Sequence, residues 1–281
     1  MRVVRSIKQM LGISKEARTQ GKSIGFVPTM GALHAGHLSL IRKARKENDF
    51  VAVSIFVNPA QFGPKEDFKK YPRNLKLDAK LCKKEGVDII FYPSAKEIYP
   101  EGYKTYVKVE DLSKVLCGSA RPGHFRGVAT VVTKLFNLVH PDIAYFGQKD
   151  AQQAIIIKKM VSDLNMPVKI KVMPTVREKD GLAMSSRNMY LNPRERKDAV
   201  VLSQALNLSG DLIKSGIRDS RKIVNRMSQL IKTKKTAKVD YISIVDLESL
   251  KPLKKITGNC LIALAVWIGK TRLIDNIIKH G

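Results

Sequence analysis

Two histidines stand three residues apart in the segment HAGH, residues 34–37, of a chain that contains only five histidines. A short apolar run typical of a buried strand precedes this segment, and a helical pattern follows it. The first N–H groups of a helix attract anions, and imidazoles at positions i and i+3 lie on one face of its first turn. Gly36 lets the backbone come close because it has no β-carbon. The pattern favours His34 and His37 as phosphate donors during nucleotidyl transfer; the alternative is one histidine that caps the helix and one that packs in the core.

Two later segments carry cationic and hydroxyl groups that suit a phosphate. Lys149 follows an apolar run in YFGQKD, where a mobile ammonium group can neutralise a phosphate as a point charge. In MSSR, Ser185 and Ser186 precede Arg187, whose guanidinium fork binds phosphate oxygens bidentately. The structural alternatives are a surface lysine and a linker between two domains.

Other polar residues have a structural explanation beside a functional one. Asp150 and Gln153 match a capping box, Asp-x-x-Gln, at the start of a helical pattern. Arg121 and His124 in RPGHFRG can line a pocket, and a turn at Pro122 explains the proline and the glycine but not these two basic side chains.

Strands and helices alternate over the first two-thirds of the chain. Apolar runs bounded by turn residues predict strands over Ile24–Val27, Phe50–Val57, Asp88–Tyr92, Ile143–Phe146 and Val168–Val172. Helical patterns cover Ile7–Thr19, Leu38–Glu47, Leu75–Glu85, Val128–Leu138 and Ala151–Leu164. This alternation predicts an α/β fold, a Rossmann-like doubly wound parallel sheet that binds ligands beyond the carboxyl ends of its strands. The HAGH segment falls there.

The pattern changes character near residues 176–187, and a second, smaller α+β domain is expected beyond that point. Asn192, Pro193 and Glu195 predict a helix start, as cap, first-turn proline and capping box. Helices are expected over Arg194–Lys214 and Ser220–Lys232, and strands over Tyr241–Val245 and Leu261–Ile268. We place the two domains at residues 1–182 and 183–281.

Composition indicates an ordinary globular chain. With 44% apolar and 27% charged residues, the 281-residue sequence does not fit the disordered class. The first twenty residues lack the apolar core of a signal peptide, and the longest apolar run is about half of a membrane span. Three scattered cysteines suit a reducing cytoplasm. The net charge of +26 is spread without a long tract, which favours a solvated surface over a nucleic-acid or membrane site.

The motifs follow one another as PTMGALHAGH, FVNPAQFG, YPR, RPGHFRG, YFGQKDAQQ and GLAMSSRN. In this order and spacing they closely resemble the pantoate–β-alanine ligase (pantothenate synthetase) family, and the likeness extends from Ile24 to the RLIDN segment, residues 272–276. The HAGH segment alone resembles only the wider nucleotidylyltransferase-like superfamily. The resemblance implies that ATP and pantoate form pantoyl-adenylate and pyrophosphate, and that β-alanine then displaces AMP. It also implies Mg²⁺, a homodimer, a site on the amino-terminal domain and a carboxyl-terminal domain that acts as a lid.

The resemblance assigns roles to matching positions. Catalysis is assigned to His34, His37, Lys149, Ser185, Ser186 and Arg187. ATP binding adds Pro28, Thr29, Met30, Gly31, Gly36, Gly147, Asp150, Val176 and Met184. Gln61 and Gln153 are assigned to pantoate; two neutral amides suit an attacking carboxylate, whose nucleophilicity an arginine fork would lower. Asn58, Arg121 and His124 are weaker candidates for the pocket or for β-alanine, and Asp78 for the metal.

Two other functions stay open on the sequence alone. A nucleotidylyltransferase that makes another activated compound would share HAGH, but it would not explain FVNPAQFG or the paired glutamines. A basic nucleic-acid-binding protein would explain the charge of +26 and would bind in a strongly salt-dependent way, but it leaves HAGH and MSSRN unexplained.

Overall fold

Six parallel strands form the sheet at the centre of the amino-terminal part of the chain, in the order β1-β4-β3-β2-β5-β6. The computed structural model describes residues 1–64 and 66–279. The strands are β1 (Arg2–Val4), β2 (Ile24–Thr29), β3 (Phe50–Ile55), β4 (Ile89–Phe91), β5 (Ile143–Gly147) and β6 (Lys169–Met173). The strand order reverses at β2 and β5, so the predicted doubly wound α/β class is confirmed.

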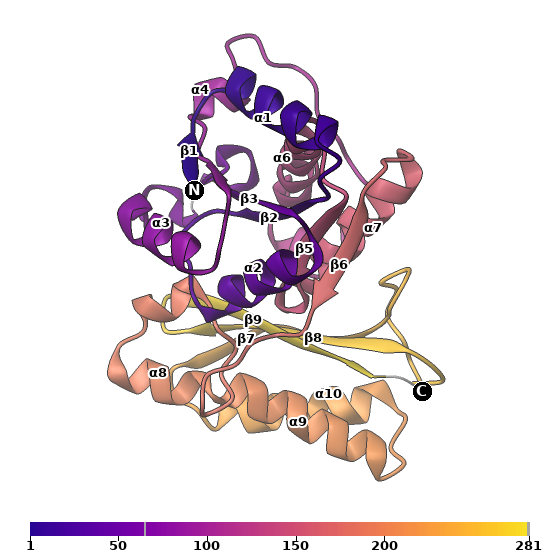
Figure 1. The fold of residues 1–281 in the computed structure, drawn as a ribbon. Helices are drawn as coiled ribbons and strands as arrows, with labels where there is room; N and C mark the ends of the chain where they lie inside the picture. Colours follow the sequence, from indigo (N-terminus) through magenta and orange to yellow (C-terminus); the bar gives the residue numbers. More distant parts are fainter. Residues whose placement is uncertain (65, 280–281) are drawn as a thin grey trace. The chain divides into compact units, whose positions relative to one another are not determined.

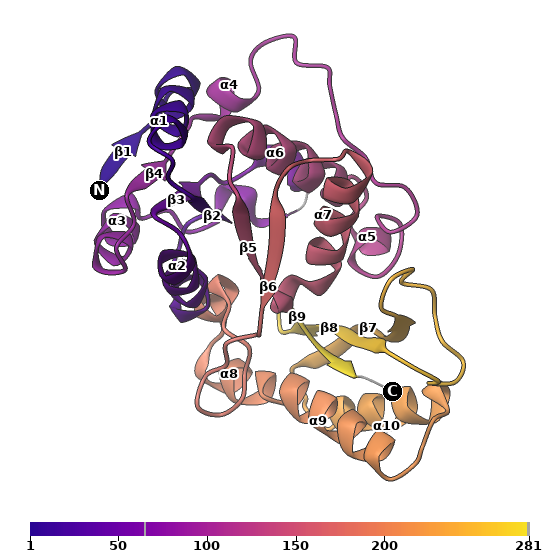
Figure 2. The same cartoon turned by 45° about the vertical axis from the view of Figure 1, so that its right-hand side comes forward.

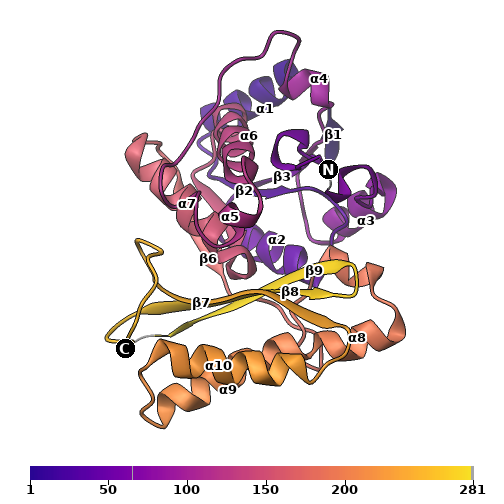
Figure 3. The same ribbon diagram turned by 180° about the vertical axis from the view of Figure 1, so that it is seen from behind.

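Helices cover both faces of this sheet, as its buried strands require. The longer ones are α1 (Ile7–Thr19), α2 (Ala35–Glu47), α3 (Leu75–Lys84), α6 (His124–Val139) and α7 (Ala151–Asp163). Figures 1 and 3 show α1 and α6 on one face and α2 and α3 on the other, and Figure 2 shows α7 beside α6. Short helical turns lie in the connections, namely η1 (Pro59–Gln61), η2 (Asp67–Lys69), α4 (Ala95–Ile98), α5 (Cys117–Ala120) and η3 (Gln148–Asp150).

The predicted start of α2 was wrong by one turn. The helical pattern of apolar residues begins at Leu38, but the helix begins at Ala35 because His34 caps it. On its buried face Leu40, Ile41 and Ala44 pack in a cluster with side chains of β3. The cap therefore places HAGH inside the first turn of the helix.

The carboxyl-terminal part has its own antiparallel sheet in the order β7-β8-β9. Its elements are η4 (Ser186–Tyr190), α8 (Pro193–Ala199), α9 (Val201–Lys214), α10 (Ser220–Lys232), β7 (Ala237–Asp246), β8 (Cys260–Ile268) and β9 (Thr271–Lys279). The capping box of Asn192 and Glu195 is confirmed by their reciprocal hydrogen bonds of 2.9 and 3.0 Å. The single helix predicted over Arg194–Lys214 is two helices, α8 and α9, which meet at Val200.

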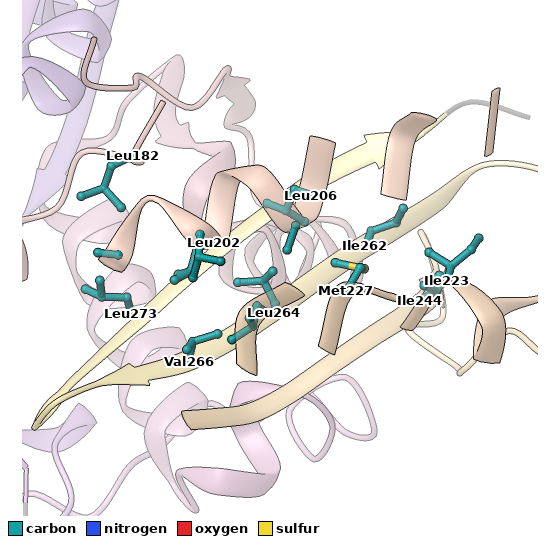
Figure 4. Packing of buried hydrophobic residues seen from close by; sticks show 14 of the residues in the cluster. Leu182, Leu202, Leu206, Ile223, Met227, Ile244, Ile262, Leu264, Val266 and Leu273 are labelled. Carbon is teal, nitrogen blue, oxygen red and sulfur yellow. The ribbon is translucent and has the colours of Figure 1, made fainter. Parts of the chain in front are cut away.

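An apolar core holds this sheet to its helices. Figure 4 shows Leu202 and Leu206 of α9 close to Ile262 and Leu264 of β8. Met227 of α10 packs in the same buried cluster. The second part of the chain therefore has its own core, as the predicted smaller α+β domain requires.

Two compact units emerge from the contacts within the chain. The first comprises residues 1–114, 118–148 and 152–174, and the second comprises residues 115–117, 149–151 and 175–281. The second unit thus includes Lys149 and the segment that carries Met184 to Arg187. Over the described stretches of the chain, no helix is both long and apolar enough to cross a bilayer.

Candidate active site

The HAGH segment forms a reciprocal cap at the start of α2. His34 is the N-cap residue, with extended backbone (φ −136°, ψ 177°). Its Nδ1 accepts the backbone N–H of Gly36 at 3.2 Å, while its own backbone N–H donates to Nδ1 of His37 at 3.3 Å. The ring centroids lie 4.1 Å apart, and neither ring is fully buried. Both side chains cap the helix, so the alternative of one capping and one core histidine is wrong.

This cap decides which ring nitrogen carries the proton. A ring nitrogen that accepts a hydrogen bond has no hydrogen of its own, so a neutral imidazole that accepts at Nδ1 is protonated at Nε2. Both rings accept at Nδ1 from backbone N–H groups. A neutral His34 and a neutral His37 therefore each carry their hydrogen on Nε2, at the amino-terminal end of a helix, where anions are favoured.

Gly36 is required by the ring of His34. A β-carbon at position 36 would lie 2.9 Å from Cε1 and 3.0 Å from Nδ1 of that ring. These distances are shorter than or at the limit of real contacts, so the ring would have to move. The glycine therefore makes room for the cap itself, in addition to the close backbone approach expected from the sequence.

Asp78 holds the turn that leads into the cap. It is 1% exposed in the first turn of α3, where Oδ2 accepts from the N–H of Ala32 at 3.0 Å and Oδ1 from that of Leu33 at 2.9 Å. Burial raises the pKa of Asp78, and the two N–H donors act in the opposite direction. Ala32 has a positive φ of 52°, a conformation that needs support in a non-glycine residue. The carboxylate thus fixes the backbone just before His34.

Gln61 is held from its side chain by Asn58. Asn58 is 1% exposed, and its Nδ2 donates to Oε1 of Gln61 at 3.0 Å and to the carbonyl of Gly127 at 3.1 Å. Its Oδ1 accepts from the N–H of Ala60 at 3.2 Å and from the hydroxyl of Tyr99 at 2.8 Å. These four bonds use both donors and both lone pairs of the amide. Asn58 thus positions Gln61 in this structure, and its expected contact with a ligand stays a prediction.

Gln61 contacts Met30, and its segment η1 packs closely on α6. Its Nε2 lies 3.1 Å from Sδ of Met30, so these two predicted substrate residues touch. A β-carbon on Gly127 would lie 2.2 Å from the carbonyl oxygen of Ala60. Gly127, the last residue of RPGHFRG, therefore lets η1 pack directly on α6.

Arg121 and His124 support Gln61 from its backbone. Nδ1 of His124 lies 2.8 Å from the carbonyl oxygen of Gln61, which can only accept, so this nitrogen carries the proton. Nε2 then accepts from Nη1 of Arg121 at 3.0 Å. The fork of Arg121 binds both oxygens of Glu66 at 2.8 and 2.5 Å. Burial raises the pKa of Glu66, but the hydrogen bonds and charge of Arg121 outweigh it and hold that pKa below its usual value.

The remaining predicted residues of the first unit lie near strand ends. Thr29 ends β2, and its hydroxyl donates to the carbonyl of Ser54 at 2.8 Å and accepts from the N–H of Gly31 at 3.1 Å. Gly147 ends β5, where an added β-carbon would meet nothing within 4 Å. Gln153 lies partly exposed in the first turn of α7. Pro28 is the partly buried residue before Thr29 in β2.

A cavity of about 470 Å³ opens at the carboxyl ends of β1 to β4. Its described lining includes Arg5, Met30, Phe56, Asp78 and Tyr92. Of the predicted site residues, Met30 and Asp78 line it, whereas neither histidine of HAGH does. The described lining of this cavity therefore includes no residue of α2.

In the second unit, the segment before MSSR is a short hairpin. Glu178 N–H donates to the carbonyl of Leu182 at 2.8 Å, and Met184 N–H to that of Val176 at 3.0 Å. Gly181 closes the turn with a φ of +93°, a conformation that glycine adopts readily. Val176 and Met184, both expected near adenine, are therefore partners across the hairpin.

The hairpin leads directly into the serines and the arginine. Ser185 caps η4, and its Oγ accepts from the N–H of Arg187 at 3.3 Å. Asn188 ties the turn back to the hairpin, since its Nδ2 donates to Oε1 of Glu178 at 2.8 Å and to the carbonyl of Ala183 at 3.1 Å. The segment Ser185–Arg187 is therefore a capped turn that is hydrogen-bonded to the hairpin, and not an irregular linker between two domains.

Lys149 is held through its backbone. It lies in the three-residue turn η3, and its carbonyl accepts from Nδ2 of Asn276 at 2.9 Å. Its Nζ is 3.8 Å from Oδ1 of Asp150, beyond hydrogen-bond distance. The RLIDN segment was noticed in the sequence only as part of the family likeness, and Asn276 was given no role there. Asn276 is buried in β9, where only four of the nine residues are apolar, so no local pattern in the sequence singles out this amide.

Comparisons with known proteins agree over the full length. A family model described as pantoate-beta-alanine ligase matches residues 2–278. A pantothenate synthetase from Fervidobacterium nodosum is 59% identical over 278 residues, which cover 99% of each chain. One from Acetivibrio thermocellus is 56% identical with the same coverage.

Two solved structures are similar as well. A crystal structure of the pantoate-beta-alanine ligase (pantothenate synthetase) from Thermus thermophilus matches with 45% identity and a TM-score of 0.94, over 99% of each chain. The pantoate-beta-alanine ligase from Francisella tularensis, complexed with beta-gamma ATP and beta-alanine, matches with 39% identity and a TM-score of 0.82. The match covers 99% of this chain and 97% of that one.

Proposed function

The chain belongs to the pantoate–β-alanine ligase family, and we propose that it joins pantoate to β-alanine with ATP through a pantoyl-adenylate intermediate. In the first step a carboxylate oxygen of pantoate bonds to the α-phosphorus of ATP, and the bond to the bridging oxygen breaks to release pyrophosphate. In the second step the amine of β-alanine bonds to the acyl carbon, the acyl–oxygen bond to AMP breaks, and the amine loses a proton.

The reciprocal cap on α2 carries this proposal. It directs two Nε2–H donors from the start of a helix, where charge that builds up on phosphate oxygens during the first step would be stabilised. The rings act as donors in this scheme and not as general bases. The first step needs no general base, because pantoate attacks as a carboxylate.

Gln61 and Gln153 would hold pantoate. The guanidinium of Arg121 contacts the backbone carbonyl of Gln61 at 3.4 Å, and Glu66 already occupies its fork. A carboxylate beside Gln61 would therefore meet a neutral amide, which binds it without withdrawing its charge as strongly as an arginine does. Asn58, Arg121 and His124 would hold Gln61 in place without contacting pantoate themselves.

The second-unit residues would bind other parts of the nucleotide. Lys149, Ser185, Ser186 and Arg187 supply an ammonium, two hydroxyls and a guanidinium for the phosphates. The ribose is assigned to Gly147 and Asp150, and adenine to Val176 and Met184. The backbone from Pro28 to Gly31 contributes to the same ligand.

Mg²⁺ fits this chain only as an ion that arrives with the triphosphate. Within residues 1–64 and 66–279, no three acidic, cysteine or histidine side chains are grouped to hold a metal. Asp78 is the one assigned carboxylate, and both of its oxygens already accept backbone N–H groups. The ion would be bound mainly by phosphate oxygens and water, where it neutralises their charge.

Two further features belong to the proposal. We assign the enzyme to the cytoplasm, because its three cysteines are buried and form no disulfide, as is usual in a reducing compartment. We also assign it a homodimeric state by family likeness.

Exchange of labelled pyrophosphate into ATP tests the proposal, because it reports the first step alone. We expect exchange only when pantoate is present. His34→Ala, His37→Ala and Lys149→Ala should each weaken adenylation by about 1.5–3 kcal/mol, the scale of a charge-assisted hydrogen bond. Exposed residues provide matched controls, His140→Asn and Lys158→Ala, which should exchange normally. Exchange that requires another acid would reject the proposed function, whereas normal exchange in all three variants would show that other residues bind the phosphates.

A further inference from the structure

The RLIDN segment lies on β9, the edge strand of the second unit's sheet. Asp275 and Asn276 are consecutive residues of this strand, and they are only 2% and 4% exposed. Successive side chains of a strand point to opposite faces. Leu273 and Ile277, on the face of Asp275, pack with the core that includes α9 and α10, so Asn276 faces the other side. The buried polar side chains of Asp275 and Asn276 thus point to opposite faces of the edge strand β9.

Asn276 reaches the backbone of Lys149. Its Nδ2 donates to the carbonyl of Lys149 at 2.9 Å, across 127 residues of sequence. Lys149 sits in the three-residue turn η3, which directly precedes α7. A lysine side chain is a flexible stem that ends in a point charge, so the place of its ammonium group depends on where its backbone is anchored.

Asp275 reaches the hairpin that carries MSSR. Its buried carboxylate accepts hydrogen bonds from Nη1 and Nη2 of Arg177 at 2.6 and 3.0 Å. Nη1 of Arg177 also donates to the carbonyl of Gly181 at 3.0 Å, which closes the hairpin turn. The backbone between Arg177 and Gly181 is thereby fixed to β9, and the hairpin continues into Ser185.

A buried ion pair contributes little to stability compared with well-packed apolar residues. Its geometry, however, is specific, because the fork and the carboxylate fit in one planar arrangement. The Arg177–Asp275 pair and the amide of Asn276 therefore fix the positions of their partners more than they stabilise the fold.

We propose that Asp275 and Asn276 are positioning residues for the adenylation step, which fix the two phosphate-binding segments, Lys149 and the MSSR turn, to one strand. The inference rests on the proposed function of those segments. Neither residue touches substrate in this scheme. Asn276 acts through the carbonyl of Lys149, and Asp275 acts through Arg177 and the hairpin.

Asn276→Asp provides the first test, because it keeps the size of the side chain and removes the donor to Lys149. Pyrophosphate exchange should show kcat/KM for ATP lowered about tenfold, the scale of one lost hydrogen bond, with KM for pantoate unchanged. Amide formation from preformed pantoyl-adenylate and β-alanine should stay within about twofold of wild type, because the triphosphate takes no part in it. Asn207→Asp, the same change on the exposed surface of α9, should leave both reactions unchanged.

A double-mutant cycle with Lys149→Ala shows whether Asn276 acts through Lys149. In the Lys149→Ala background, Asn276→Asp should cause almost no further loss of exchange, since coupled residues are not additive. If Asn276→Asp does not fold, Asn276→Ser, which also removes the amide, replaces it in the same cycle. Asp275→Asn and Arg177→Lys form the second cycle, and either single change should cost as much exchange as both together.

The outcomes separate the two proposals. Wild-type protein without pantoate-dependent exchange would refute the proposed function. Normal wild-type exchange together with unimpaired Asn276→Asp and Asp275→Asn would refute only the positioning role. Equal losses in both half-reactions, or additive losses in the cycles, would also refute it, because they indicate a general structural role.

Discussion

Gly36→Ala separates the stability of the histidine cap from its function. The added β-carbon would lie 2.9 Å from Cε1 and 3.0 Å from Nδ1 of His34. The backbone at position 36 is not in the left-handed region, so alanine is tolerated there and the side chain of His34 has to yield. The ring should swing away, and its Nδ1 should lose the N–H of residue 36.

The expected magnitudes follow from three terms. Alanine in place of glycine favours a helix by about 1 kcal/mol. Loss of the cap costs about 1 kcal/mol, so the two changes should nearly cancel in the free energy of unfolding. Under the proposed function, the displaced Nε2–H would no longer reach the phosphate, which should raise the barrier to adenylation by about 1.5–3 kcal/mol, or roughly 10- to 150-fold in rate.

Urea denaturation and pantoate-dependent pyrophosphate exchange measure the two effects on the same preparation. Gly12→Ala is the matched control, because Gly12 lies within α1 and an added β-carbon there would meet nothing within 4 Å. That change should stabilise the protein by about 1 kcal/mol and leave exchange unaltered. If Gly36→Ala exchanged at the wild-type rate, the ring position would be irrelevant to adenylation. A loss of several kcal/mol in stability would show that the backbone, and not the ring, gives way.

Three further changes test the support of the site. Asp78→Asn replaces one acceptor of the Ala32 and Leu33 N–H groups by a donor, so it should cost about 1–3 kcal/mol in urea denaturation and slow exchange; unchanged stability would contradict the anchoring role. Gln61→Glu should raise KM for pantoate roughly tenfold or more through like-charge repulsion without changing KM for ATP, and an unchanged KM for pantoate would remove Gln61 from the pantoate site. A hydrogen bond from Lys171, with smaller contributions from Lys43 and Tyr145, lowers the pKa of Glu47 to about 2 from an ordinary 4.5. Its contribution to stability is therefore complete above about pH 4.5 and is lost as the pH falls toward 2. Glu47→Gln should flatten this part of the pH–stability curve, and an identical acid dependence in the two proteins would contradict the assignment.

Elements with their own local signals were predicted well from the sequence. The helix Ile7–Thr19 has the predicted bounds, and Asn192 and Glu195 form the predicted capping box. The strand β9 was missed because Asp275 and Asn276 interrupt its apolar pattern, and both residue types are rare in strands. Their partners, Arg177 and Lys149, are distant in the sequence, so no local pattern could reveal the interactions that place them there.

The candidate site divides in the same way. HAGH was recognisable because a strand, a glycine and a helix occur together, whereas the capping role of both rings depends on side-chain rotamers that no spacing encodes. Asn58 was expected from the sequence only as a weaker candidate for the pocket or for β-alanine. Its four hydrogen bonds come from three separate segments, and only the folded chain shows that the amide is already satisfied.

The cap also determines where positive charge must come from. A ring that accepts a backbone N–H at Nδ1 is the neutral form with its hydrogen on Nε2, and a doubly protonated ring would set two donors against each other in the cap. His34 and His37 therefore contribute directed donors without a full charge. Under the proposed function, charge that develops on the phosphates during adenylation would then be balanced by Lys149, Arg187 and the Mg²⁺ proposed to accompany ATP. The chain fixes the first two through segments that Asn276 and Asp275 tie to β9, so the donors are oriented by a helix cap and the cations by a strand.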